Sequence, residues 1–363
     1  MISAADVYDY KGAVLLKKNA VLTQTGIDKL KRTQIPHIYI QDDEIKINYI
    51  FDPSDEAELL DVLRHFRSSG GKNTGVLRKY GKNKLRRILD YNNDTGNNIA
   101  YGHVLKYFTA RLAAQAGEAE CMYDFMDYRT GETYLYFHAL NTLKISLLIG
   151  ARAGLNEKEL VDLGVGVILA DIKMGNYEFI NTVRELNETE REKVRQHPAG
   201  AFEAAGRIYG LSSVSGLIAL QHHERINGSG YPRGIKADKI NIMSKIAAAA
   251  DVYDALISPR PYRKAYMPDE AFDYISKNSG IIFDSAVAGS FKQCTAKYYP
   301  GSIVETCSGE KALVVSNPGR NPEKPDLKII EKKNESDIIM GTEKHMERQK
   351  NADIKKTLSL QAV

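Results

Sequence analysis

The sequence of 363 residues contains a series of histidines and aspartates that are spaced by about one helix and its loop. In chain order the series is His138, Asp171, His197, the pair His222 and His223, and Asp251. In an antiparallel helical bundle this spacing lets each helix bring one polar side chain to the same depth. A single histidine is more often a core or surface residue. The whole series favours a metal site, because imidazoles and carboxylates are the donors that iron, manganese and zinc bind.

The residues around Asp171 and His197 support this interpretation. An apolar run at residues 160–170 ends at Asp171, and a carboxylate in a dry interior is costly unless a cation balances it. We therefore expect Asp171 to bridge two metal ions. Asn187 and Glu190 form a capping box for the helix that leads to His197. Pro198 starts the next segment, which predicts a helix junction at His197.

The remaining members of the series also have informative neighbours. His222 and His223 differ by about 100° around a helix axis, so they cannot point in the same direction. Four alanines at residues 247–250 precede Asp251 and allow a neighbouring helix to approach closely. Asp254 follows one turn later and is expected on the same helix face as Asp251.

Two segments near the histidine pair have the composition of a ligand-binding wall. Residues 224–232 read ERINGSGYP, in which Gly230 and Pro232 shape a loop and Tyr231 offers a flat ring on which a base can stack. Residues 260–264 read RPYRK, and Arg260 and Arg263 could hold phosphates. Each segment also has an ordinary interpretation, as a turn and as a solvated helix end.

The periodicity of the chain divides it into four parts. Residues 1–95 predict a small α/β module and linker, with strands at 7–8 and 14–16 and a helix from residue 54. Residues 96–299 are predicted to form a helical domain. Residues 300–332 predict a short β hairpin with a third strand at 327–330. Residues 333–363 are charged and are expected to be a mobile tail. A basic run at residues 72–87 fits a linker better than an anion-binding patch.

Composition narrows the function classes. The net charge is +4 and 43% of residues are hydrophobic, so the balance of charge does not indicate a nucleic-acid or membrane protein. The cysteines, Cys121, Cys294 and Cys307, form no CxxC pair, which argues against a disulfide framework or a zinc knuckle. The sequence also has no run of about 18 apolar residues and no signal-peptide pattern at its start. We therefore expect a cytoplasmic protein.

Several of these motifs together resemble the HD-GYP domain, the bacterial family of cyclic di-GMP phosphodiesterases. The resemblance covers residues 97–291 and rests most strongly on HHE followed by NGSGYP, with ADVYDAL, RPYRKA and GIIFDSAV after them. It implies an HD-type helical bundle, a fold that is mainly α. It also implies a centre of two divalent metal ions, iron or manganese, which activates the water that attacks the phosphodiester.

The resemblance assigns roles to individual residues. The implied metal ligands are His138, Asp171, His197, His222, His223 and Asp251. The implied substrate-binding residues are Gly230, Tyr231, Pro232, Arg260 and Arg263. Asp171 and Lys173 are the expected catalytic residues, with Asp171 between the metals and Lys173 compensating for a missing neighbour.

The sequence departs from the family pattern at three positions. Ala170 stands where the family has the histidine of its His-Asp pair, and Met174 stands where it has a lysine. Tyr134 stands where members with three metals have an acidic residue. These departures leave one of the two metal positions with a weaker set of ligands, and its occupancy is in question.

Two functions follow from these observations. The first is a metal-dependent phosphodiesterase that hydrolyses cyclic di-GMP to pGpG or GMP. The alternative is a catalytically degenerate domain that binds a cyclic dinucleotide, or a signalling protein, without hydrolysing anything. A cyclic dinucleotide is the expected partner under both, together with a homodimer contact, and neither a nucleic acid polymer nor membrane insertion is expected.

Overall fold

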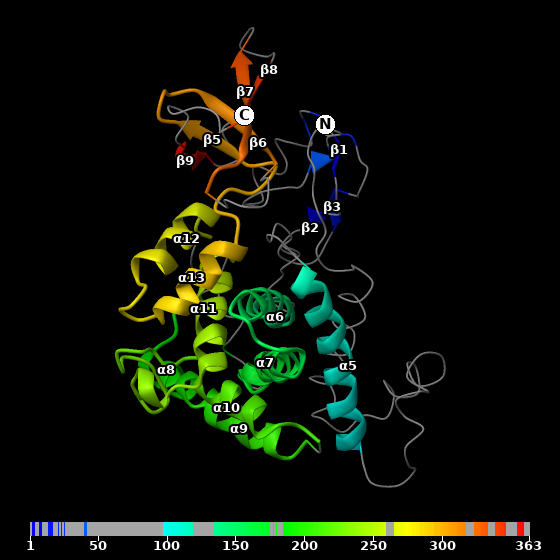
Figure 1. The fold of residues 1–363 in the computed structure, drawn as a ribbon, viewed down its shortest axis with the longest axis vertical. Helices are drawn as coiled ribbons and strands as arrows, with labels where there is room; N and C mark the ends of the chain where they lie inside the picture. Colours follow the sequence, from blue (N-terminus) through cyan, green and yellow to red (C-terminus); the bar gives the residue numbers. More distant parts are fainter. Residues whose placement is uncertain are drawn as a thin grey trace.

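The computed structural model describes residues 97–118, 134–174, 184–208, 210–258, 265–316, 323–332, 338–345 and 354–358, together with residues 177 and 179 and short stretches before residue 42. The predicted helix from residue 54, the basic run at 72–87, and Arg260 and Arg263 lie outside these residues. The elements that can be described confirm a mainly helical fold with a smaller β region (Figure 1).

The helical region contains the elements that hold the histidine and aspartate series. They are α5 (Asn97–Glu118), α6 (Tyr134–Arg152), α7 (Glu157–Ala170), α8 (Glu188–Arg195), α9 (His197–Gly206), α10 (Ser213–Gln221), α11 (Ile242–Ile257), α12 (Pro268–Lys277) and α13 (Ser285–Cys294). In Figure 1, α6 and α7 lie side by side near the middle, with α5 on one side and α11 on the other.

Helix α7 positions Asp171, which follows its last residue. It begins with a capping box, in which Asn156 accepts from the backbone N–H of Glu159 and the Glu159 carboxylate accepts from the N–H of Asn156. Its whole second half is buried. Gly166 lets α10 come close, since a Cβ at this position would lie 2.7 Å from the Cβ of Ile218. These contacts fix the end of α7, where Asp171 lies.

The N-terminal strands form two small antiparallel pairs. β1 (Ile2–Ser3) pairs with β4 (Ile40–Gln41). β2 (Val7–Tyr8) pairs with β3 (Val14–Leu16), which places strands where the sequence predicted them.

The C-terminal region is one antiparallel sheet of five strands. They are β5 (Ile303–Thr306), β6 (Lys311–Ser316), β7 (Asp326–Lys332), β8 (Ile338–His345) and β9 (Ile354–Leu358), in the order β8-β7-β6-β5-β9. The predicted hairpin is β5 and β6, and the predicted third strand is β7. A buried cluster that includes Val304, Val314 and Leu327 forms its core.

The prediction of a mobile tail at residues 333–363 is wrong for two segments. β8 pairs with β7 and β9 pairs with β5, so both add backbone hydrogen bonds to an edge of the sheet. The charges that suggested mobility are partly used, because Lys355 binds Glu305 of β5 with Nζ 2.8 Å from Oε1. The backbone N–H of Thr357 also donates to the buried Asp269 of α12. A strand at a sheet edge therefore forms without the apolar stripe that a free segment would need.

Candidate metal centre

Five helices bring the histidine and aspartate series into one cluster. His138 lies on α6, Asp171 follows α7 directly, His197 begins α9, His222 follows α10, and Asp251 lies on α11. Within the described part of the chain, their ligand atoms form two groups in which all atoms lie within 4.8 Å of one another. The histidine-rich group consists of Asp171, His197, His222 and His223. The aspartate-rich group consists of His138, Asp171 and Asp251.

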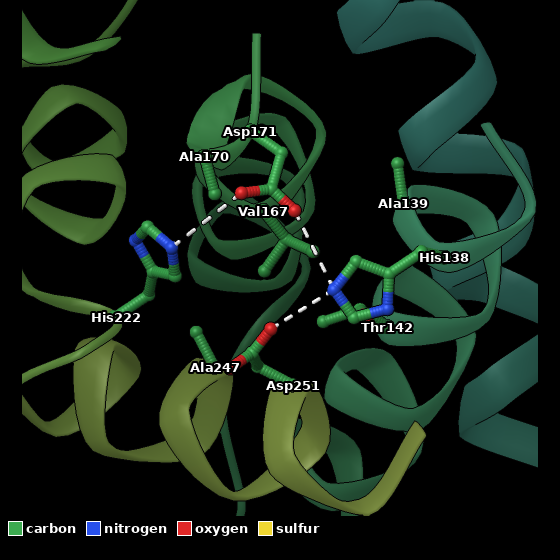
Figure 2. Close-up of a pocket in the computed structure, with 9 residues that line it drawn as sticks. All are labelled: His138, Ala139, Thr142, Val167, Ala170, Asp171, His222, Ala247 and Asp251. Atoms are coloured by element: carbon green, nitrogen blue, oxygen red, sulfur yellow. Dashed lines mark hydrogen bonds and ion pairs between the residues drawn. The ribbon is translucent and has the colours of Figure 1, made fainter. Parts of the chain in front are cut away.

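Asp171 belongs to both groups and faces each of them with a different oxygen. Its Oδ1 lies 3.2 Å from Nε2 of His197 and 4.0 Å from Nε2 of His222. Its Oδ2 lies 3.4 Å from Nε2 of His138. Figure 2 shows Asp171 between His222 and His138, with the dashed lines running to both rings. This is the position that a bridging carboxylate needs.

In the histidine-rich group, backbone carbonyls fix the tautomers of two rings. Nδ1 of His197 donates to the Val194 carbonyl at 2.6 Å, and Nδ1 of His222 donates to the Ala219 carbonyl at 2.8 Å. A carbonyl oxygen only accepts, so in the neutral imidazole Nε2 carries the free lone pair. The two Nε2 atoms lie 3.3 Å apart. Two lone pairs that face each other at this distance fit a cation bound by both.

The aspartate-rich group has a different support. Nε2 of His138 lies 3.0 Å from Oδ1 of Asp251, and Nδ1 lies 2.6 Å from Oδ2 of Asp254. Asp254 is completely buried, and Ser258 donates from its hydroxyl to the backbone carbonyl of Asp254. A carboxylate behind the ring of a metal-binding histidine fixes the orientation of that ring.

The sequence assigned no partner to Asp254, which contacts the ring of His138 in the structure. The available signal was its position one turn after Asp251. The signal gave the correct helix face, but not the partner, because His138 lies 116 residues away in the sequence.

Burial and charge set the protonation of the cluster. Burial lowers the pKa of His222 to about 4, and the neighbouring His197 adds to this effect. Burial alone would raise the pKa of Asp171, but the contact with His197 and the nearby imidazoles of His138 and His222 hold it well below its usual value. Burial would lower the pKa of His138, but Tyr134, Asp251 and Asp254 outweigh burial and raise it. His222 is therefore neutral and Asp171 ionised at neutral pH, as metal binding requires.

A small cavity separates the two sides of the cluster. It is lined by His138, Ala139, Thr142, Val167, Ala170, Asp171, His222, Ala247 and Asp251 (Figure 2). Ala170 is buried and offers only a methyl group beside Asp171. The aspartate-rich group therefore has three protein ligands and the histidine-rich group has four. The donor set fits divalent ions such as iron, manganese or zinc.

Other residues that the sequence singled out have contacts in the same helical region. Tyr134 stacks on His138 with ring centroids 5.4 Å apart. The stem of Lys173 lies against Gly200 of α9, where a Cβ would come within 3.1 Å of its Cγ. Gly230 and Pro232 flank Tyr231, whose ring stacks on His223.

The chain resembles known proteins over this same region. Residues 132–287 match the family model described as HD domain. The cyclic di-GMP phosphodiesterase PA4108 of Pseudomonas aeruginosa is 30% identical over 204 residues, which are 56% of this chain and 49% of that protein. The cyclic di-GMP phosphodiesterase response regulator RpfG of Xanthomonas campestris is 34% identical over 164 residues, 44% of this chain and 42% of that protein. A cyclic di-GMP phosphodiesterase of Thermotoga maritima is 32% identical over 204 residues, 54% of this chain and 55% of that protein.

These alignments span about half of the length of each of the three relatives. Among solved structures, Bd1817, an HDG"Y"P protein from Bdellovibrio bacteriovorus, matches with a TM-score of 0.45 and 14% identity, over 80% of this chain and 92% of that chain. Among the described helices, none is both long and apolar enough to cross a membrane. The matched region contains the HHE and NGSGYP motifs, so residues 132–287 of this chain are similar to the HD domain family and to cyclic di-GMP phosphodiesterases.

Proposed function

We propose that this chain is a metal-dependent phosphodiesterase that hydrolyses a cyclic dinucleotide, with cyclic di-GMP as the preferred substrate. The observation that carries the proposal is the pair of ligand groups that share Asp171. Bridged metal pairs are a recurrent device for hydrolysing phosphodiesters. Relatives named as cyclic di-GMP phosphodiesterases, together with a 3'3'-cGAMP-specific phosphodiesterase of Vibrio cholerae, support the substrate class.

Each residue has a part in this proposal. His197, His222, His223 and Asp171 would hold one ion, and His138, Asp251 and Asp171 would hold the other, with iron or manganese as the proposed metals. When bound, such ions lower the pKa of water and neutralise phosphoryl oxygens.

Residues outside the two ligand groups would bind the substrate. Gly230, Tyr231 and Pro232 would form one wall, and Arg260 and Arg263 would hold phosphates. Lys173, whose stem lies against Gly200 of α9, would add positive charge near the phosphate. The predicted homodimer and signalling partner stay predictions.

A second candidate, a receptor that binds without hydrolysis, is favoured by one observation. Ala170 lines the cavity beside the bridging carboxylate and supplies no ligand there. A protein with a single bound ion would still bind a cyclic dinucleotide, but would lack the second ion that two-metal hydrolysis uses.

One experiment separates the two candidates. Protein purified without oxygen is analysed for metal by mass spectrometry, and then incubated with cyclic di-GMP or 3'3'-cGAMP while the products are followed by chromatography. Metal-dependent release of the linear dinucleotide, lost in Asp171→Asn and retained in Asp238→Asn on the exposed surface, supports the phosphodiesterase. Nucleotide binding without product supports the receptor.

A further inference from the structure

The histidines of the centre differ in what fixes their rings. Nδ1 of His197 and of His222 donates to a backbone carbonyl, and Nδ1 of His138 is held by Asp254. His223 has no such bond among the described residues. Its Nδ1 lies 3.5 Å from Oδ2 of Asp251, which is an ion-pair distance. His223 is also the most exposed histidine of the histidine-rich group, with 16% of its side chain accessible.

An aromatic ring supplies the contact that His223 lacks. The ring of Tyr231 stacks on the imidazole of His223, with centroids 4.5 Å apart and planes at 30°. The rings of Tyr231 and His197 are also nearly perpendicular, at 79°, with centroids 6.4 Å apart. The ring of His223 also lies near the other two ligand rings, with ring centroids 4.0 Å from His222 and 5.0 Å from His197. The imidazole of His223 is therefore packed against three rings, those of Tyr231, His222 and His197.

The loop that carries Tyr231 is tied to the same backbone as His223. The N–H of Tyr231 donates to the carbonyl of His223 at 3.2 Å. At Gly230 a Cβ would lie 2.4 Å from that carbonyl oxygen, so only glycine permits this approach. The loop closes further through an isolated bridge between Asn227 and Lys236.

A buried carboxylate holds the far side of this loop. Glu224 is 2% exposed, and its side chain accepts from the backbone N–H of Arg233 at 2.8 Å and of Ile235 at 3.1 Å. Both bonds span the loop that contains Tyr231. A buried carboxylate that accepts two N–H groups is costly to replace, because both donors then lose their partner.

We infer that Tyr231 is a positioning residue for the metal ligand His223, and that Glu224 holds Tyr231 in place for this task. The inference rests on the proposed metal centre and adds a second role to a residue expected to stack on a base. One face of the Tyr231 ring is already covered by His223, so a nucleotide base has the opposite face available. A base that stacks on Tyr231 would then also affect the orientation of the His223 ring.

The test measures metal affinity in the absence of nucleotide, which a purely base-stacking role would not change. Metal-free protein is titrated with Mn²⁺, and bound ions are counted by electron paramagnetic resonance. Changing an outer-shell residue costs roughly 10- to 100-fold in metal affinity. We expect a loss in this range for Tyr231→Ala and for Glu224→Gln. Tyr231→Phe retains the flat ring and should stay within about twofold of the native protein, as should Tyr274→Ala, which changes an exposed tyrosine on α12.

The outcomes separate this inference from the proposed function. If Tyr231→Ala and Glu224→Gln are folded by circular dichroism and bind Mn²⁺ as tightly as the native chain, the inference is wrong while the metal centre stands. If Tyr231→Ala is unfolded, Glu224→Gln and Tyr231→Leu, which keeps the bulk without a flat ring, decide the same question. If the native chain binds neither Mn²⁺ nor Fe²⁺, the proposed function and the inference both fail. If it binds metal without hydrolysis, only the proposed hydrolysis fails.

Discussion

The two halves of the centre share Asp171 but are built by different means. In the histidine-rich group, the carbonyls that orient His197 and His222 come from three residues earlier in the same stretch of chain. In the aspartate-rich group, the residues that surround His138 come from other helices. The first arrangement follows from local helix-end geometry. The second exists only when α6, α7 and α11 are packed together.

The two halves also differ in charge. The histidine-rich group contains one carboxylate and three imidazoles, and burial keeps the pKa of His222 low, at about 4. His138 faces three carboxylates, those of Asp171, Asp251 and Asp254, and the pKa of His138 is raised. An ion that enters the aspartate-rich group must first displace a proton from His138. We therefore expect the histidine-rich group to bind its ion more tightly.

The largest effect is expected where the two halves meet. Asp171→Asn removes the charge and one ligand oxygen from both groups, so metal should be lost from both. The loss should exceed about 100-fold in affinity, since even outer-shell changes cost roughly 10- to 100-fold. Mass spectrometric metal counts per chain check this result, with Asp238→Asn as the exposed control. Retention of one ion would show that Asp171 is a ligand of only one group.

A second prediction compares ligands of the two halves. His222→Ala and His197→Ala should remove bound metal more completely than His138→Ala, because the histidine-rich group has four ligands and the aspartate-rich group has three. His138→Ala should leave about one ion per chain, counted by the same method. Equal loss in all three variants would contradict the division into a strong and a weak half.

The third prediction concerns Asp254, which contacts His138 of the aspartate-rich group. Asp254→Asn should lower metal affinity at the aspartate-rich group by roughly 10- to 100-fold, or ~1.4 to 2.8 kcal/mol, since an amide holds the His138 ring less firmly than a carboxylate. Metal titration should show one weakened and one unchanged binding step. Two weakened steps would mean that Asp254 supports the whole bundle.

The same comparison shows what the sequence could and could not predict. His197 was placed at a helix junction because Asn187, Glu190 and Pro198 are local signals, and α8 and α9 do meet there. Asp171 was placed at the end of a buried helix from another local signal, the apolar run that precedes it. The bond between His138 and Asp254 has no local signal, because it depends on how α6 and α11 pack. The stacking of Tyr231 on His223 was missed for a related reason, since the loop turns back on its own start.

The C-terminal sheet gives a second example outside the site. β5, β6 and β7 place apolar residues in the buried core of the sheet and were predicted. β9 has the sequence IKKTL, and its two lysines favoured the prediction of a solvated tail. Its pairing with β5, and the contact of Lys355 with Glu305, come from the edge that the rest of the sheet offers. The β-propensity of a single segment does not show whether a sheet edge is available to pair with it.

The smallest and most specific effect should come from Ala170→His. Ala170 lines the cavity next to Asp171, so an imidazole here would enter beside the bridging carboxylate, where the family pattern has a ligand. We expect metal occupancy of the aspartate-rich group to rise, and phosphodiesterase activity with it, while the histidine-rich group stays unchanged. The gain is limited because a larger side chain in a buried position typically costs 1 to 3 kcal/mol.

Metal counts and the rate of cyclic di-GMP hydrolysis in Ala170→His, measured beside Ala170→Val as a control for bulk, check the prediction. If metal rises and hydrolysis does not, Met174→Lys should be added, because that position has a lysine in the family pattern. If neither variant gains metal or activity while the native chain still binds cyclic di-GMP, the weak half is not a metal position and the receptor function is favoured.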